Sequence, residues 1–253
     1  MKNDLLTIGG LTVHGYGLMI GIGFIAAYLM TEYRARKYRM NTDIVFTLFI
    51  SSVVFGLLGA KVMYYLTILD RIIKDPGVIL DEMEGFVVYG GIIGGVLAGY
   101  VVCRIKKERF WQYFDLIAPA IALAQGFGRI GCLLAGCCYG KETHSHLAIT
   151  FHTSDFAPNG VPLIPTQIYS SILDFLNCIV LCVIARHARK EKTVAGCYLI
   201  FYSIGRFILE FFRGDLERGS VGVLSTSQFI SVFIFVIGVV VLFTGKKKVS
   251  VIK

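Results

Sequence analysis

The stretch AQGFGRIGCLLAGCCYG, residues 124–140, holds an arginine inside a hydrophobic run, with Gly128 and Gly131 on either side of it. The apolar residues before it extend the run, so we expect a membrane-spanning helix over residues 112–135 that contains Arg129. A cation at membrane depth costs roughly 2.5–3.5 kcal/mol on insertion scales. We therefore expect Arg129 to have a partner, a water-filled cavity or an anionic ligand.

The rest of the chain has the composition of a membrane protein. Of its 253 residues 55% are hydrophobic, and the mean hydropathy is +0.69; a soluble domain has less apolar content. Seven apolar segments of about 18–24 residues are each long enough to span a bilayer: 13–31, 44–66, 86–103, 112–135, 166–185, 194–212 and 222–245. The sequence predicts an all-α, polytopic membrane protein with seven transmembrane helices in a single domain over residues 1–253.

The charges between the segments predict the topology. Sixteen of the 25 Lys and Arg residues lie in clusters at 34–39, 104–109, 186–192 and 246–253, which alternate with sparsely basic loops at 67–85, 136–165 and 213–221. Cytoplasmic loops carry the excess of basic residues, so we expect the N-terminus outside and the C-terminus in the cytoplasm. The outer loop 136–165 is too short to be expected to form a core of its own. The net charge of +8 is explained by topology, and we expect no nucleic-acid binding.

Several polar residues are predicted at one depth, in the outer half of the bilayer. Arg129 lies roughly 9 Å below the outer end of its segment, at 1.5 Å per residue. Lys61 and Arg206 have similar depths, and Tyr16 lies near the outer surface. In segment 194–212 one helical face carries polar side chains at spacings of i, i+4, i+8 and i+11: Tyr202, Arg206, Glu210 and Arg213.

Glu210 is expected to pair with Arg206 and Arg213, either as a structural ion-pair ladder or as part of a site. Asp115 and Asp174 are expected to be poorly placed for these cations. The excess positive charge therefore needs an anion from outside the chain, and arginine guanidinium groups suit phosphate oxygens. The sequence predicts a lipid phosphate as this anion.

Two further groups of residues allow more than one interpretation. Glycines near 90–95 and 126–136 suit close helix packing or the approach of a lipid headgroup. A second group, predicted near the outer surface, consists of Cys132, Cys137 and Cys138. These cysteines could be small residues that line a tight pocket, could form a disulfide, or could include a reactive thiol. Their spacing lacks a pattern typical of metal ligands, so we expect no metal and no cofactor.

Six ordered motifs resemble the family of bacterial phosphatidylglycerol–prolipoprotein diacylglyceryl transferases. They are HGYGLM at 14–19, GAK at 59–61, YGGIIGG at 89–95, GRIG at 128–131, PTQIY at 165–169 and YSIGRFILEFFR at 202–213, with Gln228 in a later position. They extend over most of the chain. The sequence differs from the family patterns at Lys61, Tyr89, Cys132, Cys137 and Ser170, where those patterns have Arg, His, Asn, Glu and Glu.

The resemblance implies transfer of the diacylglyceryl group of phosphatidylglycerol to the lipobox cysteine of a preprolipoprotein, at the outer face of the bacterial inner membrane, with release of glycerol phosphate. It implies catalytic roles for Arg129, Arg206, Tyr16 and Glu210. It implies substrate binding by Arg129, Lys61, Tyr89, Gly90, Gly91, Tyr202, Arg213, Cys132, Cys137 and Gln167. His14 is the fallback for a general base.

The expected partners are phosphatidylglycerol, signal peptides of preprolipoproteins and membrane lipids, and the expected state is a monomer. Two alternatives stay open because of the five departures. One is a transferase of the same fold that uses another acceptor, and the other is a lipid-binding membrane protein without enzymatic activity.

Overall fold

The computed structural model describes residues 4–8, 11–81, 85–215 and 219–246. Seven of its helices are long and apolar enough to cross a membrane, which confirms the predicted fold class. They are α1 (Gly15–Lys37), α2 (Thr42–Thr67), α5 (Val88–Ile105), α6 (Phe110–Ala135), α7 (Thr166–His187), α8 (Thr193–Glu210) and α9 (Thr226–Phe243). The predicted basic cluster at 246–253 lies outside the described residues except for Lys246, as do residues 82–84 and 216–218 of two predicted outer loops.

Short elements connect the long helices. Between α2 and α5 lie two short helices, α3 (Leu69–Lys74) and α4 (Val78–Asp81). In the described part of the chain, three antiparallel two-stranded sheets pair β1 (Asp4–Ile8) with β2 (Leu11–His14), β3 (Ile149–Thr150) with β4 (Pro162–Leu163), and β5 (Ser220–Val221) with β6 (Leu224–Ser225). The sequence analysis did not predict these strands, because strands of two to five residues are too short to show a hydrophobic period.

The start of α9 shows how local chemistry sets a helix boundary. The predicted segment began at residue 222, but α9 begins at Thr226. The Ser225 hydroxyl accepts a hydrogen bond from the Gln228 amide, and the Gln228 side chain accepts one from the Ser225 amide, both at 3.1 Å. This capping box satisfies two amide groups at the helix N-terminus, so residues 222–224 remain in the turn and in strand β6.

The chain divides into two compact units, which are described separately: Met1–Thr31 with Trp111–Lys253, and Glu32–Phe110. The single domain predicted for residues 1–253 stays a prediction. In the unit Glu32–Phe110, helices α2 and α5 touch through glycines. A Cβ atom added to Gly90 would lie 2.2 Å from the carbonyl oxygen of Gly59, and one added to Gly94 would lie 2.2 Å from that of Phe55. These glycines allow the backbones of the two helices to pack closely, which agrees with the first of the two interpretations given for the glycines near residues 90–95.

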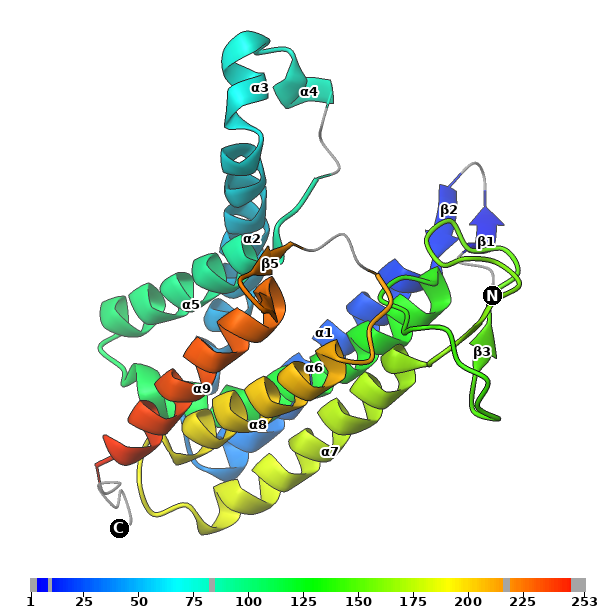
Figure 1. The fold of residues 1–253 in the computed structure, drawn as a ribbon. Helices are drawn as coiled ribbons and strands as arrows, with labels where there is room; N and C mark the ends of the chain where they lie inside the picture. The colour runs from blue at the N-terminus through cyan, green and yellow to red at the C-terminus, as the bar shows by residue number, and fades with distance from the viewer. Residues whose placement is uncertain (1–3, 9–10, 82–84, 216–218, 247–253) are drawn as a thin grey trace. The chain divides into compact units, whose positions relative to one another are not determined.

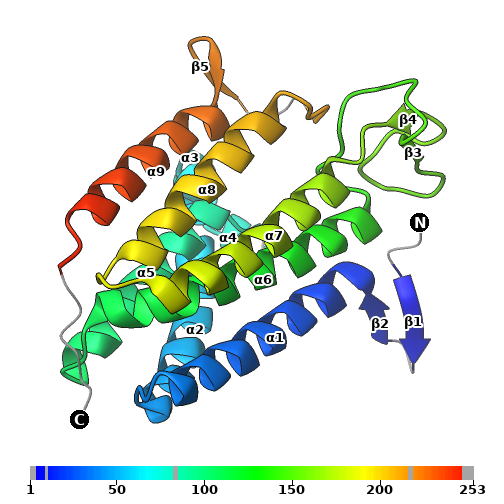
Figure 2. The same cartoon turned by 90° about the horizontal axis from the view of Figure 1, so that it is seen from below.

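In the other unit, α6, α7 and α8 run side by side, and α9 lies along α8 (Figures 1 and 2). The first part of α1 packs on α6, where a Cβ atom added to Gly23 would lie 3.1 Å from the carbonyl oxygen of Ala124. The core between α6, α7 and α8 is a cluster of buried residues: Ala118, Ala122, Cys178, Leu181, Ala185, Val194 and Tyr198. Small side chains on α6 let the neighbouring helices approach it closely.

Polar contacts also fix how α6 is aligned along α7 and α8. Asp115 of α6 accepts a hydrogen bond from the amide of Ala195 at 2.9 Å, at the first turn of α8. The carboxylate thus accepts a hydrogen bond from an amide that has no partner within the helix. Its negative charge also interacts favourably with the positive end of the dipole of α8. Ser171 of α7 donates to the carbonyl oxygen of Gly126 at 3.0 Å. Helix α6, which carries Arg129, is therefore held in a defined alignment with α7 and with α8, which carries Arg206.

The segment 136–165 does bury an apolar cluster, contrary to the expectation from its length. Phe151, Ala157 and Leu163 are buried in it, and Leu133 and Tyr139 pack against them. The β3–β4 pair joins the middle of the segment to its C-terminal end. Two backbone hydrogen bonds join its two ends: Gly140 N–H donates to the carbonyl oxygen of Ile164 at 3.1 Å, and Ile164 N–H donates to that of Lys141 at 2.9 Å. The segment is therefore anchored to the ends of α6 and α7, where the predicted site lies.

Candidate functional site

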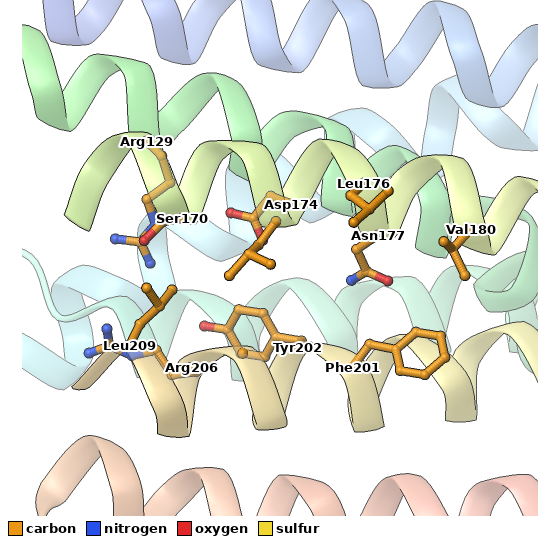
Figure 3. A pocket seen from close by; sticks show the side chains of 12 residues that line it. Arg129, Ser170, Asp174, Leu176, Asn177, Val180, Phe201, Tyr202, Arg206 and Leu209 are labelled. Atoms are coloured by element: carbon orange, nitrogen blue, oxygen red, sulfur yellow. The ribbon is translucent and has the colours of Figure 1, made fainter. Parts of the chain in front are cut away.

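A cavity of about 250 Å³ opens between α6, α7 and α8. Arg129 reaches it from α6, Asp174 and Asn177 from α7, and Tyr202 and Arg206 from α8. Figure 3 shows Arg129 and Arg206 pointing toward the same end of the space from opposite sides, with Tyr202 beside them and Val180 and Phe201 toward the other end. The cavity is therefore cationic at one end and, apart from Asn177, apolar at the other.

The lining also offers polar groups that could bind a ligand. The Oδ1 atom of Asn177 is buried and has no hydrogen-bond partner among the described residues, although the residue lines the cavity. A buried polar atom without a partner costs free energy. A ligand or water with a donor group in the cavity would remove that cost.

Arg206 forms an ion pair with Glu210 of the same helix. Its Nη2 atom lies 2.8 Å from Oε2 of Glu210, one helical turn away, and donates a hydrogen bond to the Ser227 hydroxyl of α9 at 2.8 Å. Glu210 also accepts a hydrogen bond from the Ser225 hydroxyl at 3.1 Å. The predicted pairing of Glu210 with Arg206 is confirmed. These contacts link α8 to the start of α9 and restrict the arginine side chain.

Arg213 is held by an acid that the sequence analysis had not considered. Its Nε and Nη2 atoms donate to the two carboxylate oxygens of Asp215 at 2.8 and 2.6 Å, and its Nε lies 4.0 Å from Glu210. Burial, the largest single effect, acts to lower the pKa of Arg213. The hydrogen bond and the charge of Asp215, together with interactions with Cys138, outweigh it, so the pKa is raised. Arg213 does not line the cavity, and its position next to Gly140 ties α8 to the segment 136–165.

The three cysteines at the end of α6 form one cluster. The sulfur atoms of Cys132, Cys137 and Cys138 all lie within 4.8 Å of one another. Arg129 interacts electrostatically with Cys132 and Cys138. Hydrogen bonds with the Cys132 and Cys137 thiols lower the pKa of Cys138, against the effect of burial and with the help of nearby Arg213 and Arg129.

Two predicted site residues border this cluster rather than the cavity. Tyr16 of α1 lies over Gly131, where an added Cβ atom would be 3.2 Å from the Tyr16 ring, and interacts electrostatically with the three thiols. Gln167 is only 1% exposed and donates to the carbonyl oxygen of Cys137 at 2.8 Å. The substrate-binding role predicted for Gln167 stays a prediction; in the structure Gln167 lies outside the lining of the cavity and fixes the turn that carries the cysteines.

Comparison with known proteins shows which family the chain belongs to. The family model described as "Prolipoprotein diacylglyceryl transferase" matches residues 3–244. The chain belongs to the prolipoprotein diacylglyceryl transferase family. A phosphatidylglycerol–prolipoprotein diacylglyceryl transferase of Clostridium tetani is 46% identical over 241 residues, which is 95% of this chain and 96% of the relative.

Two other relatives carry the same description. The second such transferase of Clostridium perfringens is 48% identical over 251 residues, covering 98% of this chain and 97% of the relative. The enzyme of Finegoldia magna is 31% identical over 251 residues, covering 98% of both chains. The resemblance inferred from the six motifs is confirmed.

The position of Asp174 in this member of the family was predicted wrongly from the sequence. It was expected to be poorly placed for the cations, but it lines the cavity that Arg129 and Arg206 enter, and it interacts electrostatically with Arg129. The signal was present, since Ser170, Asp174 and Asn177 recur at i, i+4 and i+7 on an apolar helix and all three line the cavity. Such a spacing puts polar side chains on one helical face.

Four predicted substrate-binding residues belong to the unit Glu32–Phe110. Lys61 donates to the carbonyl oxygen of Gly85 at 3.3 Å, and its Nζ atom lies 4.7–5.2 Å from the ring centres of Tyr64, Tyr65 and Phe86. Aromatic faces stabilise such a cation. Tyr89 is 40% exposed. Gly90 and Gly91 face carbonyl oxygens and the Cβ atoms of Met63 and Ala60 on α2, so the contacts described for them are with a neighbouring helix.

Proposed function

We propose that this chain transfers the diacylglyceryl group of phosphatidylglycerol to the cysteine thiol of a prolipoprotein and releases glycerol phosphate. The names of its relatives mention both substrates. The observation that carries the proposal is the cavity between membrane-spanning helices, with two arginines at one end and apolar side chains at the other. A phospholipid has the same division of properties.

In this proposal the phosphate binds between the guanidinium groups of Arg129 and Arg206. Charge-assisted hydrogen bonds from arginine to phosphate are short and can be bidentate. Leu173, Leu176 and Phe201 line the remaining wall and suit the glyceryl and acyl portions of the lipid. Tyr202 and Asn177 add polar groups along the wall for the ester or hydroxyl oxygens.

The reaction forms one bond and breaks another. The cysteine sulfur of the acceptor attacks the glyceryl carbon of the diacylglyceryl group, and the bond from that carbon to the phosphate oxygen breaks. Negative charge grows on the departing glycerol phosphate, where the arginines stabilise it. Asp174 is the cavity's carboxylate and can accept the thiol proton. Its protonation removes a negative charge facing the phosphate as the leaving group gains one.

Other predicted residues act around this centre. Glu210 positions Arg206 through the ion pair, and Arg213 supports the adjoining segment through Asp215. Tyr16, Cys132 and Cys137 border the site on the side of the segment 136–165. Roles for Lys61, Tyr89, Gly90 and Gly91 rest on the motifs that contain them.

The cellular setting belongs to the same proposal. We infer a multi-pass protein of the bacterial plasma membrane with its N-terminus outside and its C-terminus in the cytoplasm, from the alternation of basic clusters. The acceptor is the signal peptide region of a preprolipoprotein after export, and the protein acts as a monomer.

The test compares purified wild-type protein in detergent with Arg129→Ala. Each is incubated with phosphatidylglycerol and a lipobox peptide, and released glycerol phosphate and diacylglyceryl peptide are measured. Loss of one donor to a developing anion lowers rates by about 10²–10³-fold, which is the expected effect of R129A. Arg186→Ala is the control, because Arg186 is exposed in the last turn of α7, and its rate should match wild type.

Three results would reject parts of the proposal. Wild-type turnover by R129A would remove Arg129 from the phosphate site. Glycerol phosphate release that does not depend on the peptide's cysteine, tested with a serine-containing peptide, would indicate a different acceptor. Phospholipid binding without any release would indicate a lipid-binding protein.

A further inference from the structure

The cluster of Cys132, Cys137 and Cys138 has a geometry that the transfer reaction does not explain. Cys132 lies in the last turn of α6, and the other two follow in the turn after the helix. All three are thiols, with Cys132 buried and the others half-buried. Their sulfur atoms lie within 4.8 Å of one another, so one small ligand could contact all three.

Contacts outside the cluster keep the thiols together. Gly136 has a φ of +75°, a left-handed conformation that glycine adopts readily. The amide of Cys137 donates to the carbonyl oxygen of Cys132 at 3.1 Å. Gln167 and Thr166 of α7 donate to the carbonyl oxygens of Cys137 and Cys138, each at 2.8 Å. The turn is thus fixed by contacts to its backbone, and the three cysteines are prearranged as free thiols, without a disulfide among them.

The arrangement suits a soft divalent cation. Zinc binds thiolate sulfur at about 2.3 Å in tetrahedral geometry, which separates neighbouring sulfurs by about 3.8 Å. The three sulfur atoms all lie within 4.8 Å of one another. Side-chain rotations that move a sulfur atom by about 1 Å therefore bring them to the separation that zinc requires. Three ligands leave the fourth tetrahedral position for water or another donor, as in catalytic zinc sites.

The surrounding charge favours the bound state. A divalent cation with three thiolates carries a net charge of −1, which needs compensation at a buried site. Arg129 and Arg213 interact electrostatically with Cys138, and Arg129 also does so with Cys132. Arg129 and Arg213 would therefore stabilise this anionic complex.

We propose that Cys132, Cys137 and Cys138 form a three-thiolate binding site for a thiophilic divalent cation of the zinc and cadmium class. The site lies beside the cavity but shares none of its lining residues. It is a property of this chain's cysteines and goes beyond the proposed transfer reaction.

The test uses the full chain in detergent, reduced with a phosphine and then freed of the reductant. Cadmium is added in steps, and the thiolate-to-cadmium absorption in the ultraviolet is recorded, with zinc as competitor. We expect saturation at one ion per chain and loss of the signal when zinc is added. Cys132→Ser, Cys137→Ser and Cys138→Ser should each weaken binding at least about tenfold, which corresponds to about 1.4 kcal/mol. Cys197→Ser, which changes a cysteine of α8 outside the cluster, should bind as wild type does.

A second readout on unmodified protein avoids dependence on the folding of the variants. Bound cadmium should slow alkylation of the three cluster thiols, measured peptide by peptide by mass spectrometry, and leave the alkylation of Cys197 unchanged. The proposal is overturned if wild-type protein takes up no cadmium, if C137S binds as tightly as wild type, or if C197S loses binding equally. Transfer activity is assayed separately, so failure of the metal site leaves the proposed reaction intact.

Discussion

Neutralising Glu210 tests whether the ion pair behind Arg206 acts as a buried charge pair. The side chains of Arg206 and Glu210 are only 13% and 8% exposed, and their charged atoms lie 2.8 Å apart. Glu210→Gln retains the size and the ability to accept from the Ser225 hydroxyl, but removes the charge. Breaking a buried pair costs about 3–5 kcal/mol, because the remaining charge stays buried without compensation.

The structure favours the lower end of that range for E210Q. Arg206 keeps its hydrogen bond to Ser227 and borders the cavity. Arg213, the more distant partner at 4.0 Å, keeps both hydrogen bonds to Asp215. We therefore expect a loss of about 3 kcal/mol. At about 2–4 °C per kcal/mol for chains of this size, the unfolding midpoint should fall by roughly 6–12 °C.

The assay is thermal unfolding in detergent, followed by the fluorescence of Trp111, the chain's one tryptophan. Glu32→Gln is the matched control. Glu32 pairs with Arg36 at the same i, i+4 spacing, but the Arg36 side chain is 71% exposed. Exposed helix pairs contribute about 0.3–0.5 kcal/mol, so E32Q should shift the midpoint by only about 1–2 °C. A midpoint for E210Q equal to that of E32Q would refute the reasoning.

Two other changes test the helix start and the helix packing by the same unfolding measurement. Ser225→Ala removes the hydroxyl that caps α9 and should cost about 1 kcal/mol; an unchanged midpoint would mean that the capping box contributes nothing. Gly90→Ala should lower the midpoint because its Cβ would lie 2.2 Å from the carbonyl oxygen of Gly59. Gly21→Ala is its control, since nothing lies within 4 Å of the added atom, and it should be neutral or stabilising by up to about 1 kcal/mol. Equal effects of G90A and G21A would contradict the packing account.

Membrane-spanning segments could be read from the sequence because their signal is local and long. Each needs about 20 apolar residues, whatever it packs against, and all seven predicted segments correspond to helices. Their boundaries were less predictable where a single side chain decides them, as Ser225 does for α9. The pairing of Glu210 with Arg206 was also local, since both lie on one face of one helix.

Contacts between residues of different segments could not be predicted from such local signals. Asp174 was expected to be poorly placed for the arginines. Its spacing from Ser170 and Asn177 puts these three side chains on one face of α7, but whether that face meets Arg129 depends on how α7 is rotated against α6. Asp215 was not considered, because the hydrogen bonds to Arg213 form in the turn after α8. Gln167 was assigned to substrate from its motif, but its contact is with a backbone carbonyl 30 residues away in the chain.

The sequence by itself determined that this protein is a seven-helix membrane protein of its family with arginines inside the spans, since hydrophobic length, buried charge and ordered motifs are properties of the chain. The tertiary structure alone decided which polar groups share a space with those arginines. It brought Asp174 and Asn177 into one cavity with Arg206, and gathered three thiols whose spacing showed no metal pattern. The physical reason is that helix rotation and the course of a turn are set by packing between segments, which no local pattern in the sequence encodes.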